Sequence, residues 1–142
     1  IFYFTFQYNC SSIYFIMRKT KIESKDIASP VGPYNHAVSI SNFIFLSGQI
    51  PLDKNGLIVA GGVKEQTLQC LNNIETVLKT VGKNRGDIIK ITIFLVNMNS
   101  FSEVNAVYSA FFEDTVYPAR TTVEVSRLPR EAMIEIEAIA VY

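Results

Sequence analysis

Apolar residues return at helical spacing in two parts of the chain. Between residues 63 and 81 they recur every three or four positions, and Gly82 follows where a left-handed glycine commonly ends a helix. A second helix is predicted over 101–112. Ser100 and Glu103 have the spacing of a capping box at its start. The pattern therefore predicts two amphipathic helices.

Shorter runs of β-branched and aromatic residues predict strands. The run at 37–49 is interrupted by Ser41-Asn42, which indicates a tight turn between two strands. Further strands are predicted at 87–97, 120–126 and 133–142. Residues 51–62 contain Pro, Asp, Asn and three Gly, and are predicted to form a loop. The predicted order is β-β-α-β-α-β-β, an α+β fold with two helices on one face of a mixed sheet.

Several of these strands are apolar on both faces. Ile44 and Leu46 point to one side of their strand, whereas Phe43 and Phe45 point to the other. Ile93 and Leu95 oppose Phe94 and Val96 in the same way. Because two helices cover only one face of the sheet, a monomer would expose a large apolar surface. The sequence therefore predicts an oligomer, without giving its copy number.

Composition limits the classes of function. The 142 residues are 49% hydrophobic and 18% charged, which suits one folded domain. The formal net charge of zero argues against nucleic acid as the main ligand. Cys10 and Cys70 have no motif spacing and there is one histidine, so neither a disulfide framework nor a metal site is expected. A reducing, cytoplasmic setting fits this usage of cysteine.

The first sixteen residues differ from the rest. They carry no charge and are crowded with Phe, Tyr and Ile, and Met17 follows them. Polar residues interrupt the run, and no basic segment precedes it, which argues against a membrane span or a secretory signal. Three interpretations stay open. The segment is translated sequence upstream of a start at Met17, an organellar leader, or an additional strand.

Arg120 is the main candidate for ligand binding. It begins a strand on which Arg120, Thr122, Glu124 and Ser126 share one face. A guanidinium binds a planar carboxylate through two parallel hydrogen bonds, so such a polar face indicates a cleft or a subunit boundary. The alternative is a structural ion pair of Arg120 with Glu124 or Glu135.

The last strand and the loop before residue 37 hold further candidates. Glu135 and Glu137 share one strand face, where they would orient water or transfer protons, or else simply face solvent. His36 is the only histidine, and a lone histidine more often has a structural role. Tyr34 has a ring and a hydroxyl that would close over a ligand, and Gly48 lets backbone approach one. From the residues alone, the result is an oligomeric α+β domain with an arginine-containing cleft.

Six short segments are spread along residues 21–142. They are SPVGPY at 29–34, LSGQIP at 46–51, VNAVY at 104–108, YPART at 117–121, RLP at 127–129 and IEIEAIA at 134–140. Together, and in this order, they resemble the RidA/YjgF family of reactive-intermediate deaminases. The resemblance implies that residues 1–20 form an extension outside a domain at 21–142.

The resemblance implies a chorismate-mutase-like fold assembled as a homotrimer, in which three sheets form a central barrel and the sites lie between subunits. It further implies hydrolysis of 2-iminobutanoate and 2-iminopropanoate to 2-oxo acids and ammonia, without metal or cofactor. Arg120 would bind the substrate carboxylate and Glu135 would orient the attacking water. Other residues implied to line the pocket are Tyr34, Ser47, Gly48, Asn105 and Thr122.

One position departs from the family pattern. Many members carry Cys two residues after the arginine, where this chain has Thr122. Thiol chemistry is therefore not expected there, although the deamination scheme does not need it. Two other functions stay open. One is an endoribonuclease or translation inhibitor, as some members are described, and the other is a trimer that binds 2-oxo acids without turning them over. An organellar location is the alternative to the cytoplasm if the first residues are a leader.

Overall fold

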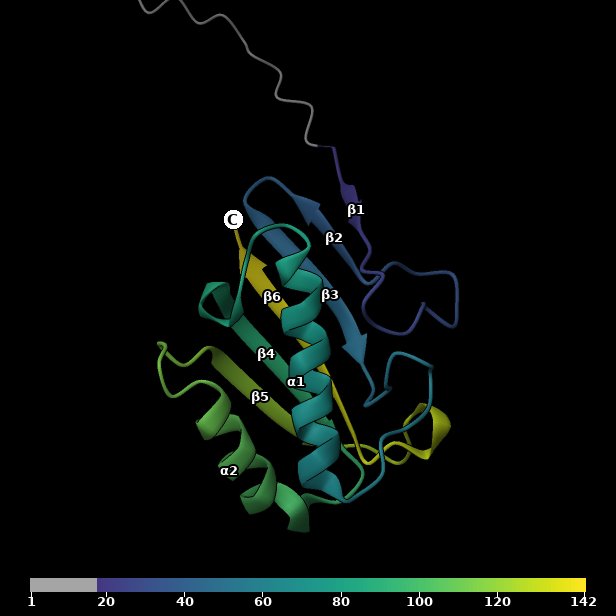
Figure 1. Ribbon diagram of the computed structural model, residues 1–142. Helices are drawn as coiled ribbons and strands as arrows, with labels where there is room; N and C mark the ends of the chain where they lie inside the picture. Colours follow the sequence, from purple (N-terminus) through teal and green to yellow (C-terminus); the bar gives the residue numbers. More distant parts are fainter. Residues whose placement is uncertain (1–17) are drawn as a thin grey trace, which may run out of the picture.

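The computed structural model describes residues 18–142, which fold as one α+β domain (Figure 1). The predictions for residues 1–16 and for Cys10 lie outside the described residues. Within residues 18–142, six strands form one sheet in the order β1-β2-β3-β6-β4-β5. The strands are β1 (Thr20–Ile22), β2 (Ala37–Ile40), β3 (Phe43–Gln49), β4 (Ile88–Leu95), β5 (Ala119–Glu124) and β6 (Ile134–Val141).

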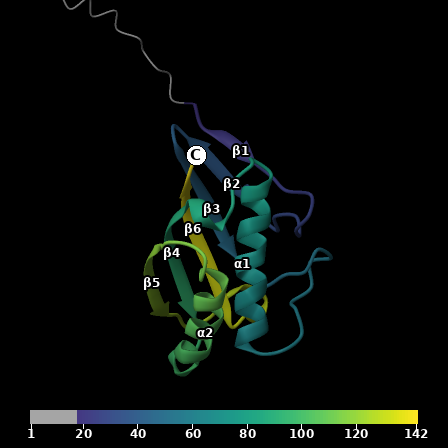
Figure 2. The same cartoon turned by 60° about the vertical axis from the view of Figure 1, so that its left-hand side comes forward.

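Two helices, α1 (Val63–Lys79) and α2 (Phe101–Phe111), cover one face of this sheet (Figure 2). Neighbouring strands run antiparallel except β4 and β5, which are parallel, so the predicted mixed sheet with two helices on one face is confirmed. Short 3-10 turns lie at Arg85–Asp87, Met98–Ser100 and Pro129–Glu131. The domain boundary proposed at residue 21 stays a prediction, and β1 begins at Thr20.

The core lies between the helices and the sheet. Alternate residues of β6, from Ile134 to Ala140, are buried beneath α1, as are Ile44 and Leu46 of β3. Ile91, Ile93 and Leu95 of β4 are buried on the same side. The fully buried thiol of Cys70 lies in this layer, 3.8 Å from the carbonyl oxygen of Ile134. These alternate side chains therefore line the face of the sheet that the helices cover.

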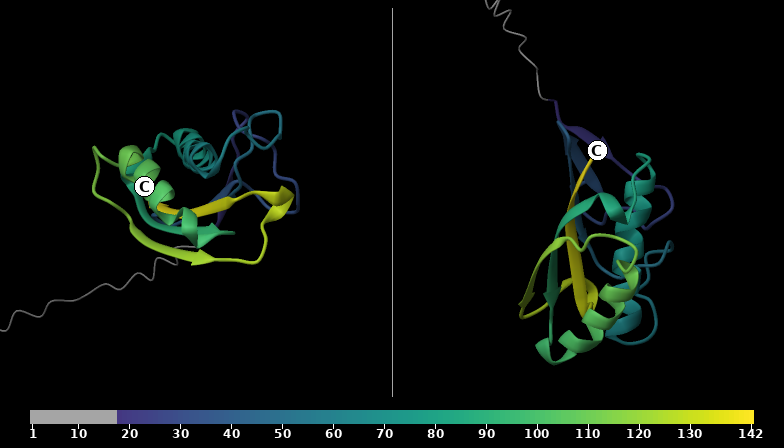
Figure 3. Two further views of the ribbon diagram at one scale, coloured as in Figure 1. Left: turned by 90° about the horizontal axis from the view of Figure 1, so that it is seen from below. Right: turned by 90° about the vertical axis from the view of Figure 1, so that its left-hand side faces the viewer.

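The opposite face of the sheet carries no helix (Figure 3). Phe43 and Phe45 are 43% and 41% exposed there, and their rings lie 6.3 Å apart. In the neighbouring strand, Ile139 and Val141 pair with these two phenylalanines and share their face. The prediction of strands that are apolar on both sides is confirmed, and the sheet of the single chain does not close on itself.

The predicted capping box of Ser100 and Glu103 is wrong. Ser100 has nearly helical dihedral angles (φ −81°, ψ 0°) because it ends a 3-10 turn, and its side chain makes no capping bond. Asn97 caps that turn instead, accepting a hydrogen bond from the backbone of Asn99 at 3.0 Å. Glu103 pairs with Lys64 at 3.6 Å. The extra turn shifts the helix start away from the geometry that the box requires.

The first helix ends slightly earlier than predicted. Its last residue, Lys79, pairs with Glu75 at 3.0 Å, and two turn residues follow before Gly82. Gly82 has φ +72°, the left-handed conformation that favours glycine. A glycine that ends a helix usually follows the C-cap residue directly, whereas Gly82 lies one residue later.

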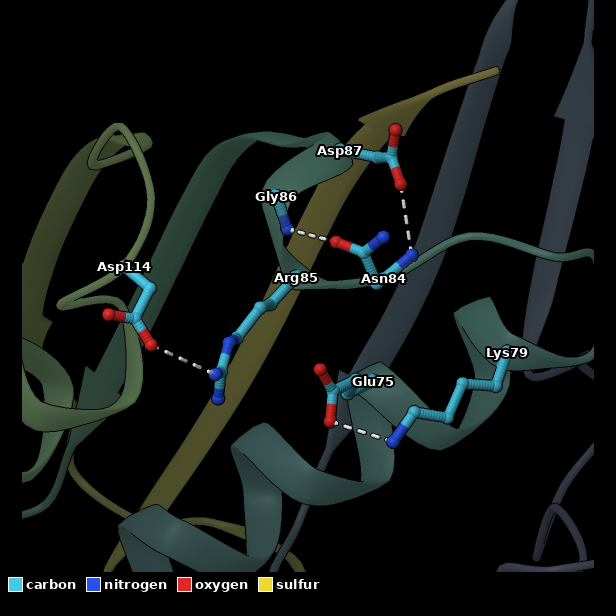
Figure 4. Close-up of polar contacts among 7 residues, drawn as sticks. All are labelled: Glu75, Lys79, Asn84, Arg85, Gly86, Asp87 and Asp114. Carbon is cyan, nitrogen blue, oxygen red and sulfur yellow. Dashed lines mark hydrogen bonds and ion pairs between the residues drawn. The ribbon is translucent and has the colours of Figure 1, made fainter.

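The connection from α1 to β4 is held by its own side chains (Figure 4). Asn84 accepts a hydrogen bond from the backbone of Gly86 at 2.8 Å, and its own N–H donates to Asp87 at 2.9 Å. Arg85 reaches Asp114, on the loop between α2 and β5, at 3.9 Å. These contacts join the start of β4 to the segment that leads into β5.

Candidate functional site

The predicted site residues fall into two groups on opposite faces of the sheet. Arg120 of β5 pairs in register with Ile91 of β4, whose side chain is buried beneath the helices. Glu135 of β6 pairs with Phe94 of β4, which points to the other face. Paired residues of adjacent strands share a face. One chain therefore presents two partial sites, here named the arginine half-site and the glutamate half-site.

The arginine half-site is built on aromatic rings. The guanidinium of Arg120 lies 4.6 Å from the ring centroid of Tyr108 and 5.6 Å from that of Phe101, both on α2. Among the described residues, Arg120 makes no ion pair and no hydrogen bond. Glu124 instead accepts a hydrogen bond from the backbone of Met98 at 2.6 Å. The alternative of a structural ion pair is therefore wrong for the described chain, and the charge is available to a ligand.

Two open pockets flank Arg120. One, of about 420 Å³, lies between α2 and the segment leading into β5, and Arg120, Asn105, Tyr108, Ser109, Tyr117 and Pro118 line it. The other, of about 510 Å³, is lined by Met98, Phe101, Arg120 and Thr122. The structure therefore brings three predicted residues together here, namely Arg120, Asn105 and Thr122.

This region also contains buried polar atoms without a partner. They are the Oδ1 atom of Asn105, the hydroxyl of Tyr108 and the hydroxyl of Thr122, none of which has a hydrogen-bond partner among the described residues. Most buried polar atoms in proteins are hydrogen-bonded, because leaving one unpaired is unfavourable. Three such atoms around one unpaired guanidinium are typical of a binding site rather than of a packed core.

The glutamate half-site is a pocket of about 290 Å³. It is lined by Val31, Tyr34, Ser47, Gly48, Ile50, Pro129 and Glu135, so the four other predicted residues lie together. The carboxyl group of Glu135 lies directly over Gly48, and a Cβ atom at that glycine would overlap it. Gly48 therefore leaves the space that the Glu135 carboxyl occupies, and it has no left-handed backbone conformation.

Burial raises the pKa of the Glu135 carboxyl, and the charge of Glu137 raises it further. Glu137 lies on the same strand face and is exposed. A carboxyl group with a raised pKa in a pocket is suited to accept and return a proton. Of the two glutamates, Glu135 is the one that the pocket contains.

Backbone contacts hold the rest of this pocket. The hydroxyl of Ser47 donates to the carbonyl oxygen of Asn35 at 2.7 Å, and the N–H of Ser47 donates to that of His36 at 2.9 Å. Tyr34 is 45% exposed at the rim, and its hydroxyl accepts a hydrogen bond from the N–H of Val31 at 3.4 Å. Ser47 is therefore held in place, whereas the ring of Tyr34 is open to solvent.

His36 has a structural role. Its Nδ1 accepts a hydrogen bond from the N–H of Ser24 at 3.1 Å, and its Nε2 donates to the carbonyl oxygen of Ala28 at 2.9 Å. Only the neutral tautomer protonated at Nε2 makes both bonds. Since both ring nitrogens bind backbone, His36 has no nitrogen left for proton transfer.

The buried Cys70 is not suited to act as a nucleophile. Burial raises the pKa of the Cys70 thiol well above its ordinary value, so it stays protonated. Within residues 18–142, no group of three or more His, Cys, Asp or Glu side chains is placed to hold a metal, and no helix is long and apolar enough to cross a bilayer. The guanidinium of Arg130 donates a hydrogen bond to the carbonyl oxygen of Gly56 at 2.6 Å, so Arg130 has a structural contact of its own.

Sequence reasoning missed the aromatic part of the arginine half-site. Phe101 and Tyr108 lie on the predicted second helix, and neither was among the residues predicted to line the site. The stacking of Tyr108 under Arg120 depends on how closely α2 approaches the edge strand β5. The YPART and VNAVY segments carried the only available signal, since they place Arg120 and Tyr108 in matched segments of one family.

The chain matches known proteins over most of its length. The family model described as Endoribonuclease L-PSP matches residues 25–142. A RutC family protein of Pyrococcus horikoshii is 47% identical over 123 residues, covering 86% of this chain and 97% of that protein. The chain belongs to the RidA/YjgF family. A 2-iminobutanoate/2-iminopropanoate deaminase of Salmonella typhimurium is 42% identical over 127 residues, covering 88% of this chain and 98% of that one.

A solved structure extends the RidA/YjgF likeness to the fold. YyfA from Yersinia pestis, a member of the conserved Rid protein family, superposes with a TM-score of 0.85 at 43% identity. The match covers 88% of this chain and 100% of YyfA. The expected family fold is therefore confirmed for the single chain.

Proposed function

We propose that this RidA/YjgF protein hydrolyses 2-imino acids such as 2-iminobutanoate and 2-iminopropanoate to 2-oxo acids and ammonia. The observation that carries the proposal is the guanidinium of Arg120, which has no hydrogen-bond or ion-pair partner among the described residues. The pockets that it lines also contain the three residues with unpaired buried polar atoms. A guanidinium in this state suits a small carboxylate ligand. The name of the Salmonella typhimurium relative supports the same chemistry.

The complete site is formed by two copies of the chain, in a homotrimer with three such sites. Arg120 and Glu135 face opposite sides of one sheet, so a single chain does not bring them to one substrate. The exposed apolar face with Phe43 and Phe45 favours burial against other copies. The arginine half-site of one copy then meets the glutamate half-site of the next.

The reaction needs positioning and electrostatics only. Arg120 binds the carboxylate and fixes the carbon of the protonated imine, which is already electrophilic. Glu135, as the carboxylate, takes a proton from water while the water oxygen bonds to that carbon. It then returns the proton to nitrogen. As the carbon–nitrogen bond breaks, the carbon–oxygen double bond forms and the hydroxyl proton passes to Glu135, which gives it to the released ammonia. One protonated imine and one water give one 2-oxo acid and one ammonium ion.

The endoribonuclease named in the family description has less support in this chain. Acid–base cleavage of RNA needs proton-transfer groups and a basic groove. His36, the only histidine, uses both nitrogens on backbone, and the formal net charge is zero. Binding of 2-oxo acids without turnover is the other alternative, and it needs Arg120 but not Glu135.

A coupled assay tests the proposal. Threonine dehydratase generates 2-iminobutanoate, and the formation of 2-oxobutanoate is followed with and without this protein. Wild type and Arg127→Ala, which changes an exposed arginine outside both half-site pockets, should accelerate the reaction, whereas Arg120→Ala should not. If folded wild type does not accelerate imine decay, the deaminase proposal is wrong. Measurable binding of 2-oxobutanoate would then favour the non-catalytic alternative, and RNA cleavage at constant specific activity through purification would favour the nuclease.

A further inference from the structure

The hydroxyl of Tyr108 is a buried polar group without a partner in the described chain. Tyr108 is 4% exposed. Its ring packs against Phe112, with centroids 4.7 Å apart, and against Tyr117 at 6.4 Å. The ring packing accounts for an aromatic residue here, but phenylalanine would pack in the same way. The hydroxyl therefore needs a separate explanation.

The position of the ring relative to Arg120 supplies one. The guanidinium of Arg120 lies 4.6 Å from the ring centroid of Tyr108, and the two residues line one pocket together with Asn105. Asn105 lies three residues earlier on α2, which places both side chains on the same face of the helix. A carboxylate bound to the guanidinium is therefore brought to the edge of the tyrosine ring, where the hydroxyl lies.

The protonation state of the phenol suits this role. Burial raises the pKa of Tyr108 to about 12, although the nearby charge of Arg120 acts in the other direction. The group is then a neutral hydrogen-bond donor throughout the physiological range. A phenolate would repel a carboxylate, whereas a phenol donates to it.

We propose that the Tyr108 hydroxyl donates a hydrogen bond to the carboxylate that Arg120 holds, and is thus a further binding residue for 2-imino and 2-oxo acids. This rests on the proposed function for the class of ligand. The hydroxyl is covered by protein atoms, so the ligand reaches it after a neighbouring side chain moves.

Tyr108→Phe tests the proposal because it keeps the ring and removes only the hydroxyl. Tyr142→Phe is the matched control, since it removes a hydroxyl from an exposed tyrosine that lines neither half-site. Binding of 2-oxobutanoate is measured by calorimetry, turnover by the coupled assay, and stability by thermal unfolding. Tyr108→Phe should weaken binding roughly tenfold or more, the range for hydrogen bonds to charged groups, and leave the melting temperature unchanged or higher. Tyr142→Phe should bind as wild type does.

The outcomes separate this inference from the proposed function. If Tyr108→Phe binds 2-oxobutanoate as tightly as wild type, or wild type does not bind it, the inference is overturned. Wild-type affinity with a lower melting temperature would show that the hydroxyl serves the fold or the contact between copies. If wild type does not hydrolyse imines but Tyr108→Phe still weakens binding, the inference holds and the deaminase proposal fails.

Discussion

Arg120 and Glu135 lie on opposite faces of the same sheet, with strand β4 between their strands. Arg120 is held against the rings of α2, on the face that the helices cover. Glu135 lies in a pocket on the open face, over Gly48. Each residue has the surroundings of a functional group, yet within one chain they do not share a pocket. This arrangement is the structural reason for proposing sites between copies.

Gly48→Ala should reduce turnover by displacing Glu135. A Cβ atom at Gly48 overlaps the Glu135 carboxyl, so the carboxylate moves away from the position where it orients water. A displacement of this size is expected to lower kcat by roughly a hundredfold, with a smaller change in KM because Arg120 is untouched. Steady-state kinetics in the coupled assay give both constants.

Gly56→Ala provides the control for that substitution. Gly56 has φ +80°, and nothing lies within 4 Å of an added Cβ atom. This variant should lose about 1 kcal/mol of stability from backbone strain and keep its kcat. Equal effects of the two substitutions on kcat would contradict the role given to Glu135.

The sequence predicted the elements better than their arrangement. The hairpin at Ser41-Asn42 and both helices follow from local periodicity, because each depends on neighbours along the chain. The insertion of β6 between β3 and β4 depends on long-range pairing, which no local pattern contains. The 3-10 turn before α2 likewise displaced the predicted cap at Ser100.

The sequence analysis named the residues of the candidate site but did not predict how they are arranged in space. Alternation along β5 correctly put Arg120 and Thr122 on one face, and alternation along β6 put Glu135 opposite the core. Which of these faces the helices cover follows only from the pairing of β4 with both strands. The unpaired hydroxyl of Tyr108 is visible only after α2 is packed on the sheet.

The acid limb in the pH profile of kcat should have an apparent pKa above the usual range of a glutamate. Burial and the charge of Glu137 raise the pKa of Glu135, so its carboxylate, the form that accepts a proton from water, appears only at higher pH. Glu137→Gln removes the neighbouring charge and should shift the acid limb of kcat to lower pH. An acid limb that stays in place or moves upward in Glu137→Gln would contradict the assignment of Glu135 as the base.

His36→Ala should lower stability and leave the chemistry in place. The substitution removes the partners of the Ser24 N–H, which is buried, and of the Ala28 carbonyl, which is partly buried. Leaving the buried N–H unpaired costs about 1–3 kcal/mol. Thermal unfolding measures this loss, and kcat is measured at a temperature where the variant is folded. A variant as stable as wild type but without turnover would assign His36 to catalysis instead.

Mixing two inactive variants tests the central claim, that one site takes Arg120 from one copy and Glu135 from another. Arg120→Ala and Glu135→Gln are unfolded and refolded together, and mixed oligomers are verified by native mass spectrometry. Random assembly in a ring should restore intact sites at roughly a quarter of the interfaces, although each variant alone is inactive. Arg120→Ala refolded with the double variant Arg120→Ala/Glu135→Gln should recover nothing. Verified mixed oligomers of the two single variants without deaminase activity would contradict the shared site.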